Sequence, residues 1–286
     1  MKTRIITAVV GLAVLAVVLA FFDTILFDLV LAAICLLGIH EVFTAMGFGK
    51  KQWYLYVAAV PFTMLLMLSS SGAARAALLA VGFLTVLFYN VVLITHDKTL
   101  DFGKLSGFIY FSGVILFCFY SLIHLKRCLP MDMYGYDAIY FILLILCFAW
   151  GGDTCAYFAG RAFGKHKLCP VVSPKKTVEG AIGGVLGTMV FGVAATVIYS
   201  IAANRMEAFT RTNIGVSMYL IIALLACVAA VLGIYGDLFA SVVKRQCGIK
   251  DYGTIFPGHG GILDRFDSVM FIAPFVTMVV IAVFYH

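Results

Sequence analysis

Residues 214–240 read IGVSMYLIIALLACVAAVLGIYGDLFA, and Asp237 is the first charged residue in this stretch. A helix needs about 20 predominantly apolar residues to cross the roughly 30 Å hydrocarbon core of a bilayer. The segment is long enough to cross it, and its continuation carries Lys244 and Arg245. It therefore predicts a membrane-spanning helix whose final turns are polar.

The composition of the whole chain also indicates a membrane protein. Of the 286 residues, 63% are hydrophobic and only 12% are charged, with a mean hydropathy of +1.07. A soluble domain has roughly a quarter of its residues charged, so this chain cannot cover itself with a water-soluble surface. The composition also excludes disorder, and the modest net charge of +6 argues against a nucleic-acid binder.

Apolar stretches between charged residues predict an all-α, polytopic transmembrane bundle of about nine spans. Their approximate limits are 5–22, 24–40, 53–70, 76–95, 105–125, 134–152, 178–203, 214–240 and 266–285. Only Asp23 and Thr24 separate the first two, so we expect a tight turn there, or one re-entrant unit. Phe21 and Phe22 follow the first apolar stretch where a cleaved signal peptide would have a polar flank, which favours a retained span.

The distribution of charge predicts sidedness and two functional regions. With an internal N-terminus, fifteen of the 20 Lys and Arg residues fall on the cytoplasmic side, where the positive-inside rule places them. Polar residues are sparse in 1–140, which we interpret as a transmembrane scaffold, and they concentrate in 141–286, the predicted catalytic region. The eight cysteines lack the spacing of a zinc site or redox pair and are expected to be packing residues.

The first polar segment, 150–180, begins at the end of a predicted span. Asp153 lies there, with Tyr157 and Arg161 at i+4 and i+8 on the same helical face. An ionisable group at membrane depth is costly and usually functional. The alternative is that Asp153 only forms a structural ion pair with Arg161.

Ser173 and Pro174 have the chemistry of a helix N-cap and first helical residue. We therefore predict that the next helix starts there, with Lys175, Lys176 and Thr177 in its first turn. Two lysines at a helix end that is already positive call for an anion, and a polyphosphate fits. The alternative is a solvated pair that only sets topology. The glycines that follow have the small-xxx-small spacing of a close helix-packing face, namely Gly180, Gly183, Gly184 and Gly187.

The second polar segment, 233–268, has carboxylates on two predicted helices. One helical stripe contains Asp237, Ser241, Lys244 and Arg245, and another contains Asp264, Asp267 and Ser268. Carboxylates from two helices can meet, and Mg²⁺ binds one or two carboxylates together with water and substrate phosphate. The glycines of 257–261 let backbone N–H groups approach phosphate. The segment predicts metal-assisted phosphate chemistry at the cytosolic face.

A specific pattern extends over residues 241–267. It reads Ser241-x-Val243-Lys244-Arg245-x4-Lys250-Asp251-x-Gly253-x2-Phe256-Pro257-x-His259-Gly260-Gly261-Ile262-x-Asp264-Arg265-Phe266-Asp267. This pattern resembles, without departure, the signature of the phosphatidate cytidylyltransferases (CDP-diacylglycerol synthases). Residues 153–161 and 173–180 resemble the nucleotide-side region of the same family. The N-terminal half is similar only in being hydrophobic.

The resemblance implies transfer of the cytidylyl group of CTP to phosphatidic acid, with Mg²⁺ and a second, monovalent cation such as K⁺. By similarity, Asp237 and Asp264 are the metal ligands. We assign Asp153 and Asp267 to the surroundings of the metal or to the second cation, and His259 either donates to phosphate or shapes its turn. Residues expected to act on the phosphates or to line the substrate sites are Arg161, Ser173, Lys175, Lys176, Thr177, Ser241, Lys244, Arg245, Lys250, Gly260, Gly261 and Arg265.

The expected partners are CTP, phosphatidic acid and membrane lipids, with no nucleic acid, and the resemblance also implies a homodimer. The expected location is a bacterial inner membrane, with the active site facing the cytoplasm. Two other functions compete with this one. A CTP-dependent lipid-alcohol kinase would release CDP instead of pyrophosphate. An anionic-lipid transporter would show related halves, whereas here the polar residues cluster in one half and at one face.

Overall fold

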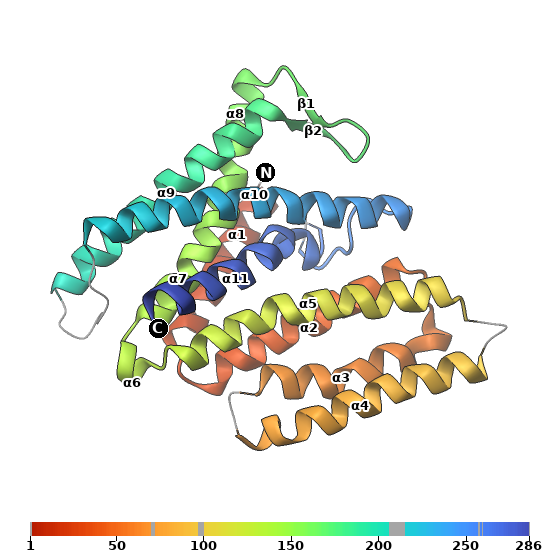
Figure 1. Ribbon diagram of the computed structural model, residues 1–286. Helices are drawn as coiled ribbons and strands as arrows, with labels where there is room; N and C mark the ends of the chain where they lie inside the picture. Colours follow the sequence, from red (N-terminus) through yellow and green to blue (C-terminus); the bar gives the residue numbers. More distant parts are fainter. Residues whose placement is uncertain are drawn as a thin grey trace. The chain divides into compact units, whose positions relative to one another are not determined.

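Figure 1 shows the chain as a computed structural model. The structure describes residues 2–69, 72–96, 100–205, 215–256, 258 and 260–285; the side chains of residues 2–5, 72–74 and 204–205 are not described. His259, one of the predicted site residues, lies outside this part of the chain.

The described chain is almost entirely helical. Its elements are α1 (Lys2–Ala20), α2 (Ile25–Ala45), the short helix η1 (Lys50–Gln52), α3 (Trp53–Met67), α4 (Gly72–Thr95), α5 (Phe102–Cys128), α6 (Met131–Tyr134), α7 (Asp137–Leu146), the π-helix η2 (Cys147–Gly151), α8 (Gly152–Phe163), β1 (Lys167–Cys169), β2 (Ser173–Thr177), α9 (Val178–Arg205), α10 (Val216–Gln246) and α11 (Leu263–Phe284). The predicted all-α fold is confirmed.

Seven segments of the described chain are long and apolar enough to cross a membrane. They are Ile25–Ala45, Arg75–Thr95, Phe102–Cys128, Asp137–Phe163, Val178–Ala203, Val216–Gln246 and Leu263–Phe284. The other two predicted spans are also helices, but the apolar part of α1 is only Ile6–Ala20, and α3 has 15 residues with Pro61 inside it. The predicted polytopic membrane protein is confirmed, with seven such segments among the described residues against the approximately nine spans expected.

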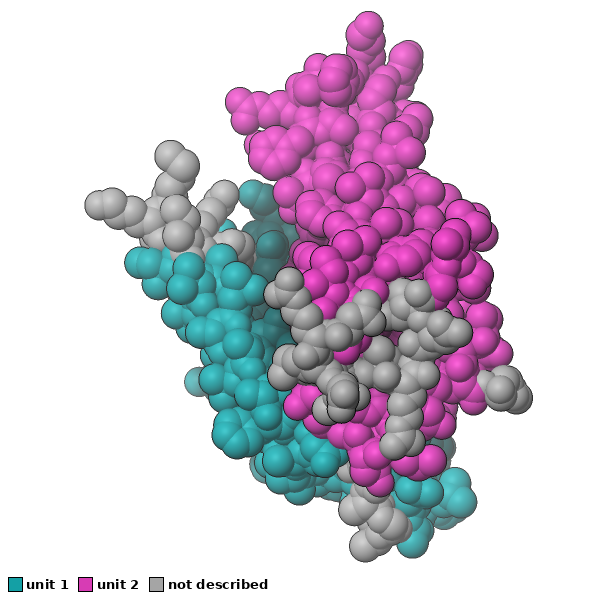
Figure 2. Space-filling model, turned by 90° about the vertical axis from the view of Figure 1, so that its left-hand side faces the viewer, with its two compact units in different colours: residues 1–123, 246–265 teal, residues 124–245, 266–286 magenta. Residues whose placement is uncertain are grey.

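The chain divides into two compact units, coloured separately in Figure 2. Unit 1 comprises residues 1–123 and 246–265, and unit 2 comprises 124–245 and 266–286. This division differs from the functional one expected at residue 140. Residues 246–265 of the signature belong with the N-terminal helices and not with the rest of the polar region.

In unit 1, α2, α3, α4 and α5 run alongside one another (Figure 1). Aromatic side chains join α2 to α5, since the rings of Phe43 and Phe108 lie edge to face with centroids 6.0 Å apart. The hydroxyl of Tyr89 on α4 donates to the carbonyl of Leu55 on α3 over 2.8 Å. The expected tight turn is present at residues 21–24, where the Thr24 hydroxyl accepts the N–H of Leu26 and caps α2.

In unit 2, α8 and α9 pack along the glycine face that the sequence predicts (Figure 1). A Cβ atom on Gly184 would lie 3.0 Å from the Cβ of Ala156, and one on Gly183 would overlap the Cβ of Ala159. Gly187 has the same relation to Cys155. The small residues therefore let the two helix backbones approach more closely than larger side chains would allow.

The predicted helix start at Ser173 is wrong. Residues 173–177 form strand β2, which pairs antiparallel with β1, and α9 begins only at Val178. A residue that precedes proline is pushed towards extended backbone, so Ser173 before Pro174 favours a strand as well as a cap. The cap is instead Thr177, whose hydroxyl accepts the N–H of Gly180 over 3.1 Å.

Buried polar groups in unit 2 find partners. The carboxylate of Asp137, 1% exposed, accepts hydrogen bonds from the hydroxyls of Tyr199 (2.5 Å) and Tyr285 (2.6 Å). These two hydrogen bonds join α7, α9 and the C-terminal end of the described chain. Across both units, all eight cysteines are free thiols, and Cys35 and Cys118 are buried.

The glycine face of α9 gives the first testable prediction. Gly183→Ala adds a methyl group that overlaps Ala159, and overpacking of this kind costs about 1–3 kcal/mol. The matched control is Gly113→Ala in α5, where nothing lies within 4 Å of the added Cβ and alanine is the better helix former. Thermal unfolding in detergent should show a lower Tm for Gly183→Ala only. An equal shift in both variants would contradict the packing.

Candidate active site

Three carboxylates from three helices lie within electrostatic reach of one another in unit 2. They belong to Asp153 on α8, Asp237 on α10 and Asp267 on α11. The carboxylate of Asp267 interacts electrostatically with those of Asp153 and Asp237, and its residue is only 9% exposed. Like charges within electrostatic reach repel one another, so positive charge beside the cluster stabilises it.

Glycines on α10 bring the helices of this cluster close. A Cβ atom on Gly236 would lie 2.5 Å from the backbone oxygen of Asp267, and one on Gly233 would lie 3.0 Å from Ile272. The backbones of α10 and α11 therefore touch one residue before Asp237. The close approach explains how Asp237 and Asp267, on different helices, come within electrostatic reach of each other.

Asp237 has two partners of its own. Lys176 Nζ on β2 forms an ion pair with Asp237 Oδ2 at 2.5 Å. The hydroxyl of Ser241, one turn further along α10, donates to Asp237 Oδ1 over 3.2 Å. Lys244, only 8% exposed on the same stripe, interacts electrostatically with Asp267. Lys176 and Lys244 thus supply the positive charge that the three carboxylates need.

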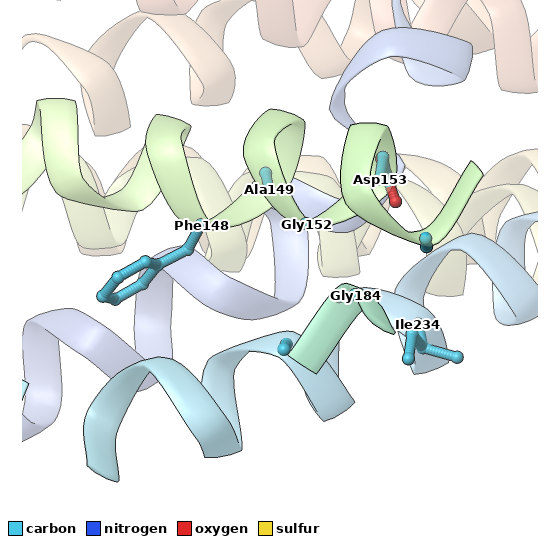
Figure 3. Close-up of a pocket in the computed structure, with 9 residues that line it drawn as sticks. Phe148, Ala149, Gly152, Asp153, Gly184 and Ile234 are labelled. Atoms are coloured by element: carbon cyan, nitrogen blue, oxygen red, sulfur yellow. The ribbon is translucent and has the colours of Figure 1, made fainter. Parts of the chain in front are cut away.

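Asp153 lies where a small cavity opens among α8, α9 and α10 (Figure 3). Its Oδ2 accepts a hydrogen bond from the Ser268 hydroxyl on α11 over 3.3 Å. The cavity has a volume of about 20 Å³ and is otherwise lined by apolar and small residues, including Phe148, Gly184 and Ile234. The π-helix η2 ends two residues before Asp153, and such irregular turns are frequent at functional sites.

The β1–β2 hairpin is tied to the first turn of α9. The carboxylate of Glu179 accepts the N–H of Lys165 over 3.0 Å and bonds His166 Nδ1 over 2.6 Å. The hairpin ends at Thr177, beside Lys176. Of the other predicted substrate residues in unit 2, Ser173 is half-buried on β2, whereas Arg161, Lys175 and Arg245 are exposed.

In unit 1, Asp264 organises the glycine-rich part of the signature. Its Oδ2 accepts the N–H groups of Tyr252 (2.8 Å) and Gly261 (2.9 Å). Gly260 has φ +88°, and a Cβ there would lie 2.8 Å from the same Oδ2, so glycine is required twice over. Lys250 and Arg265 are exposed at the two ends of this region. Asp237 and Asp264 belong to different units, and their convergence stays a prediction.

The donor set suits hard cations. Within the part of the chain that the structure describes, no three His, Cys, Asp or Glu side chains are grouped to hold a metal by themselves. Mg²⁺ does not need such a cage, because it keeps several waters and binds through one or two carboxylates and substrate phosphates. A lysine ammonium already neutralises Asp237, which shows that a cation fits against this carboxylate.

Comparison with known proteins gives the family. The model of the cytidylyltransferase family matches residues 2–283. The chain belongs to this family. It is 30% identical to a phosphatidate cytidylyltransferase of Haemophilus influenzae, with 96% of each chain covered, and 30% identical to one of Staphylococcus aureus, covering 98% of this chain and 99% of that one. A third, from Bacillus subtilis, is 34% identical over 72% of this chain and 68% of its own.

Sequence reasoning missed two features of the site in this cytidylyltransferase family member. Gly236 lies inside the predicted span 214–240, but Gly236-Asp237 is the point where α10 meets α11. Glu41 lies one residue beyond the predicted span 24–40, and its carboxylate accepts N–H groups of the signature loop in unit 1. The available signal is an acidic residue at the end of an apolar stretch, because ionisable residues at membrane depth are usually functional.

Proposed function

We propose that this chain transfers the cytidylyl group of CTP to phosphatidate and thereby forms CDP-diacylglycerol and pyrophosphate. The relatives that cover nearly the whole chain are named phosphatidate cytidylyltransferases, which supports the substrates and the reaction. The observation that carries the site is the ion pair of Lys176 with Asp237, beside Asp153 and Asp267. Neither the kinase nor the transporter alternative has support from the relatives.

The reaction needs charge control more than an activated side chain. A phosphomonoester oxygen of phosphatidate, largely ionised at neutral pH, attacks the α-phosphorus of CTP. A new phosphorus–oxygen bond forms, the bond from the α-phosphorus to the bridging β-phosphate oxygen breaks, and pyrophosphate leaves with the electron pair. No Ser, Cys or His nucleophile is required. The enzyme's task is to bring two anions together and to stabilise the leaving charge.

Asp237 and Asp264 are the proposed Mg²⁺ ligands, and Asp153 and Asp267 are proposed for the surroundings of the metal or for a second, monovalent cation such as K⁺. When bound, Mg²⁺ supplies charge stabilisation at the phosphate oxygens. The carboxylate oxygens of Asp237 suit this role, because the residue already holds one cation, Lys176, and one hydroxyl donor, Ser241.

The basic residues act on the phosphates. Lys176 exchanges its partner Asp237 for a phosphate oxygen of CTP, and its hairpin is fixed on α9 by Glu179 and Thr177. Lys244 balances Asp267. The exposed cations are proposed to act on the phosphates of either substrate, and Ser173, Thr177, Ser241, Gly260 and Gly261 complete the proposed set. The exposed cations are Arg161, Lys175, Arg245, Lys250 and Arg265.

The bias of Lys and Arg supports an active site at the cytoplasmic face of a bacterial inner membrane. CTP then arrives from the cytosol, whereas phosphatidate stays in the leaflet and enters between helices with its acyl chains in lipid. We also propose that the chain acts as a homodimer, as the family resemblance implies. The other membrane lipids would surround the apolar helices of the chain.

The reaction type is tested with labelled CTP. Purified protein supplied with phosphatidate and Mg²⁺ should incorporate label from [α-³²P]CTP into lipid and release label from [γ-³²P]CTP as pyrophosphate. Both products should be lost when phosphatidate is omitted. A kinase would place the γ-label in a lipid and release CDP, so that pattern with a lipid alcohol would refute the proposed transfer.

Asp264→Asn tests the metal assignment. The neutral amide removes an anionic oxygen ligand, and we expect liponucleotide formation to fall about 100-fold or more. Mn²⁺ binding, followed by electron paramagnetic resonance, should weaken in the same variant while its elution from gel filtration stays unchanged. Asp132→Asn, which neutralises an exposed carboxylate on α6, is the control. Unchanged Mn²⁺ affinity in Asp264→Asn would remove this residue from the metal site.

Lys176→Ala tests the nucleotide side. Loss of a charge-assisted contact to phosphate should raise the KM for CTP about tenfold, with the KM for phosphatidate nearly unchanged. Lys167→Ala is the matched control, since Lys167 is an exposed lysine on the other strand of the same hairpin. If both variants raise the KM equally, the effect of Lys176 is general electrostatic attraction and not a specific contact.

A further inference from the structure

Glu41 connects the N-terminal half of the chain to the signature. It lies on α2, is 2% exposed, and accepts the backbone N–H groups of Ile262 (2.8 Å) and Leu263 (2.9 Å). These two residues flank the start of α11, where N–H groups have no partner within the helix. A carboxylate more than 200 residues away in sequence therefore caps α11.

The signature loop closes around the same carboxylate. A Cβ atom on Gly253 would lie 2.5 Å from Glu41 Oε1, and one on Gly261 would overlap the carboxylate. Glycine at both positions lets the loop backbone reach Glu41 directly. Glu41 is thus the cap, and the glycines of two loop segments make room for its carboxylate. Larger side chains at these positions would displace it.

Asp264 shares this network. Its Oδ2 takes the N–H groups of Tyr252 and Gly261, while Glu41 takes those of the next two residues, Ile262 and Leu263. The two carboxyl groups interact electrostatically, and negative charge on both makes this interaction repulsive. The amides between them, together with the positive end of the α11 dipole, offset the repulsion. Glu41 therefore fixes the turn from which Asp264 projects.

We propose that Glu41 is a positioning residue for Asp264. It sets the start of α11, and with it the direction of the Asp264 carboxylate, without touching either substrate. The inference rests on the proposed function, in which Asp264 is a metal ligand. It also assigns a function to the N-terminal helix α2, whose packing contacts hold Glu41 in place. Gly38 contacts Leu263, with 3.1 Å from a Cβ built there to Leu263 Cδ2, and Phe43 packs on Phe108.

Glu41→Gln is the sharpest variant, because it keeps size and shape but removes the charge that holds two N–H groups. The amide nitrogen of the glutamine would face a backbone N–H group, and it cannot accept that hydrogen bond. We expect kcat to fall at least about tenfold, which is the rate equivalent of one charge-assisted hydrogen bond. The KM for CTP should stay within about twofold, since Glu41 does not bind the nucleotide. Glu41→Asp, which retains the charge, should recover part of the loss.

Hydrogen–deuterium exchange on the full chain distinguishes positioning from general stability. In Glu41→Gln, peptides covering 250–264 should exchange faster, while peptides from α2 and α5 should match wild type. The control is Asp28→Asn, which neutralises another buried carboxylate of α2, also 2% exposed and about 20 Å away along the helix. This control should keep both wild-type kcat and wild-type exchange in 250–264.

The outcomes separate the two proposals. If wild-type protein makes no liponucleotide, the proposed function fails whatever Glu41 does. If wild type is active and Glu41→Gln keeps its kcat, or exchanges faster throughout unit 1, positioning by Glu41 is refuted. Should Glu41→Gln not fold, Glu41→Asp gives the same decision, because a shortened carboxylate must still loosen 250–264 locally and lower kcat if it positions Asp264.

Discussion

A backbone N–H group that is buried outside regular secondary structure needs an acceptor from the protein, because water does not reach it. The signature loop meets this constraint with two carboxylates. Glu41 and Asp264 between them accept the N–H groups of Tyr252, Gly261, Ile262 and Leu263. A glycine-rich loop without these acceptors would be free to collapse or to move. The loop and the start of α11 therefore depend on an acid in the second helix of the chain.

Negative charge imposes the complementary constraint in unit 2. Asp153, Asp237 and Asp267 come from three helices that glycines bring together, and their mutual repulsion is relieved by Lys176 and Lys244. Such a cluster costs stability in the absence of cations. It is for that reason well suited to bind a cation and the phosphates that accompany it. The two lysines come from different elements and act on different carboxylates. Lys176 on β2 pairs with Asp237, and Lys244 on α10 interacts with Asp267.

Much of this arrangement could be predicted from the sequence, because it depends on local periodicity. Apolar stretches predict the helices, and the glycines of α9 predict its contact with α8. The i, i+4 spacing places Asp237 and Ser241 on one helical face, where they form a hydrogen bond. The role of Glu41 could not be predicted in this way. Its partners lie more than 200 residues away, and no periodic pattern relates them. The predicted helix start at Ser173 is wrong for another reason. A Ser-Pro pair is compatible with both a helix cap and a strand, and here the segment pairs with β1.

The local structure of β2 presents Lys176, and not Lys175, to the carboxylates. The strand pairs with β1 at Ser173 and at Thr177, and the pairing is irregular between these two points, where both lysines lie. Lys175 is exposed, whereas Lys176 pairs with Asp237. The register is fixed next to this point, because Thr177 caps α9 and lies against Gly160 and Gly164 of the α8 end. A shift of one residue would present Lys175 or Thr177 in place of Lys176. The glycine packing of α8 on α9 therefore determines, through one short strand, which cation serves Asp237.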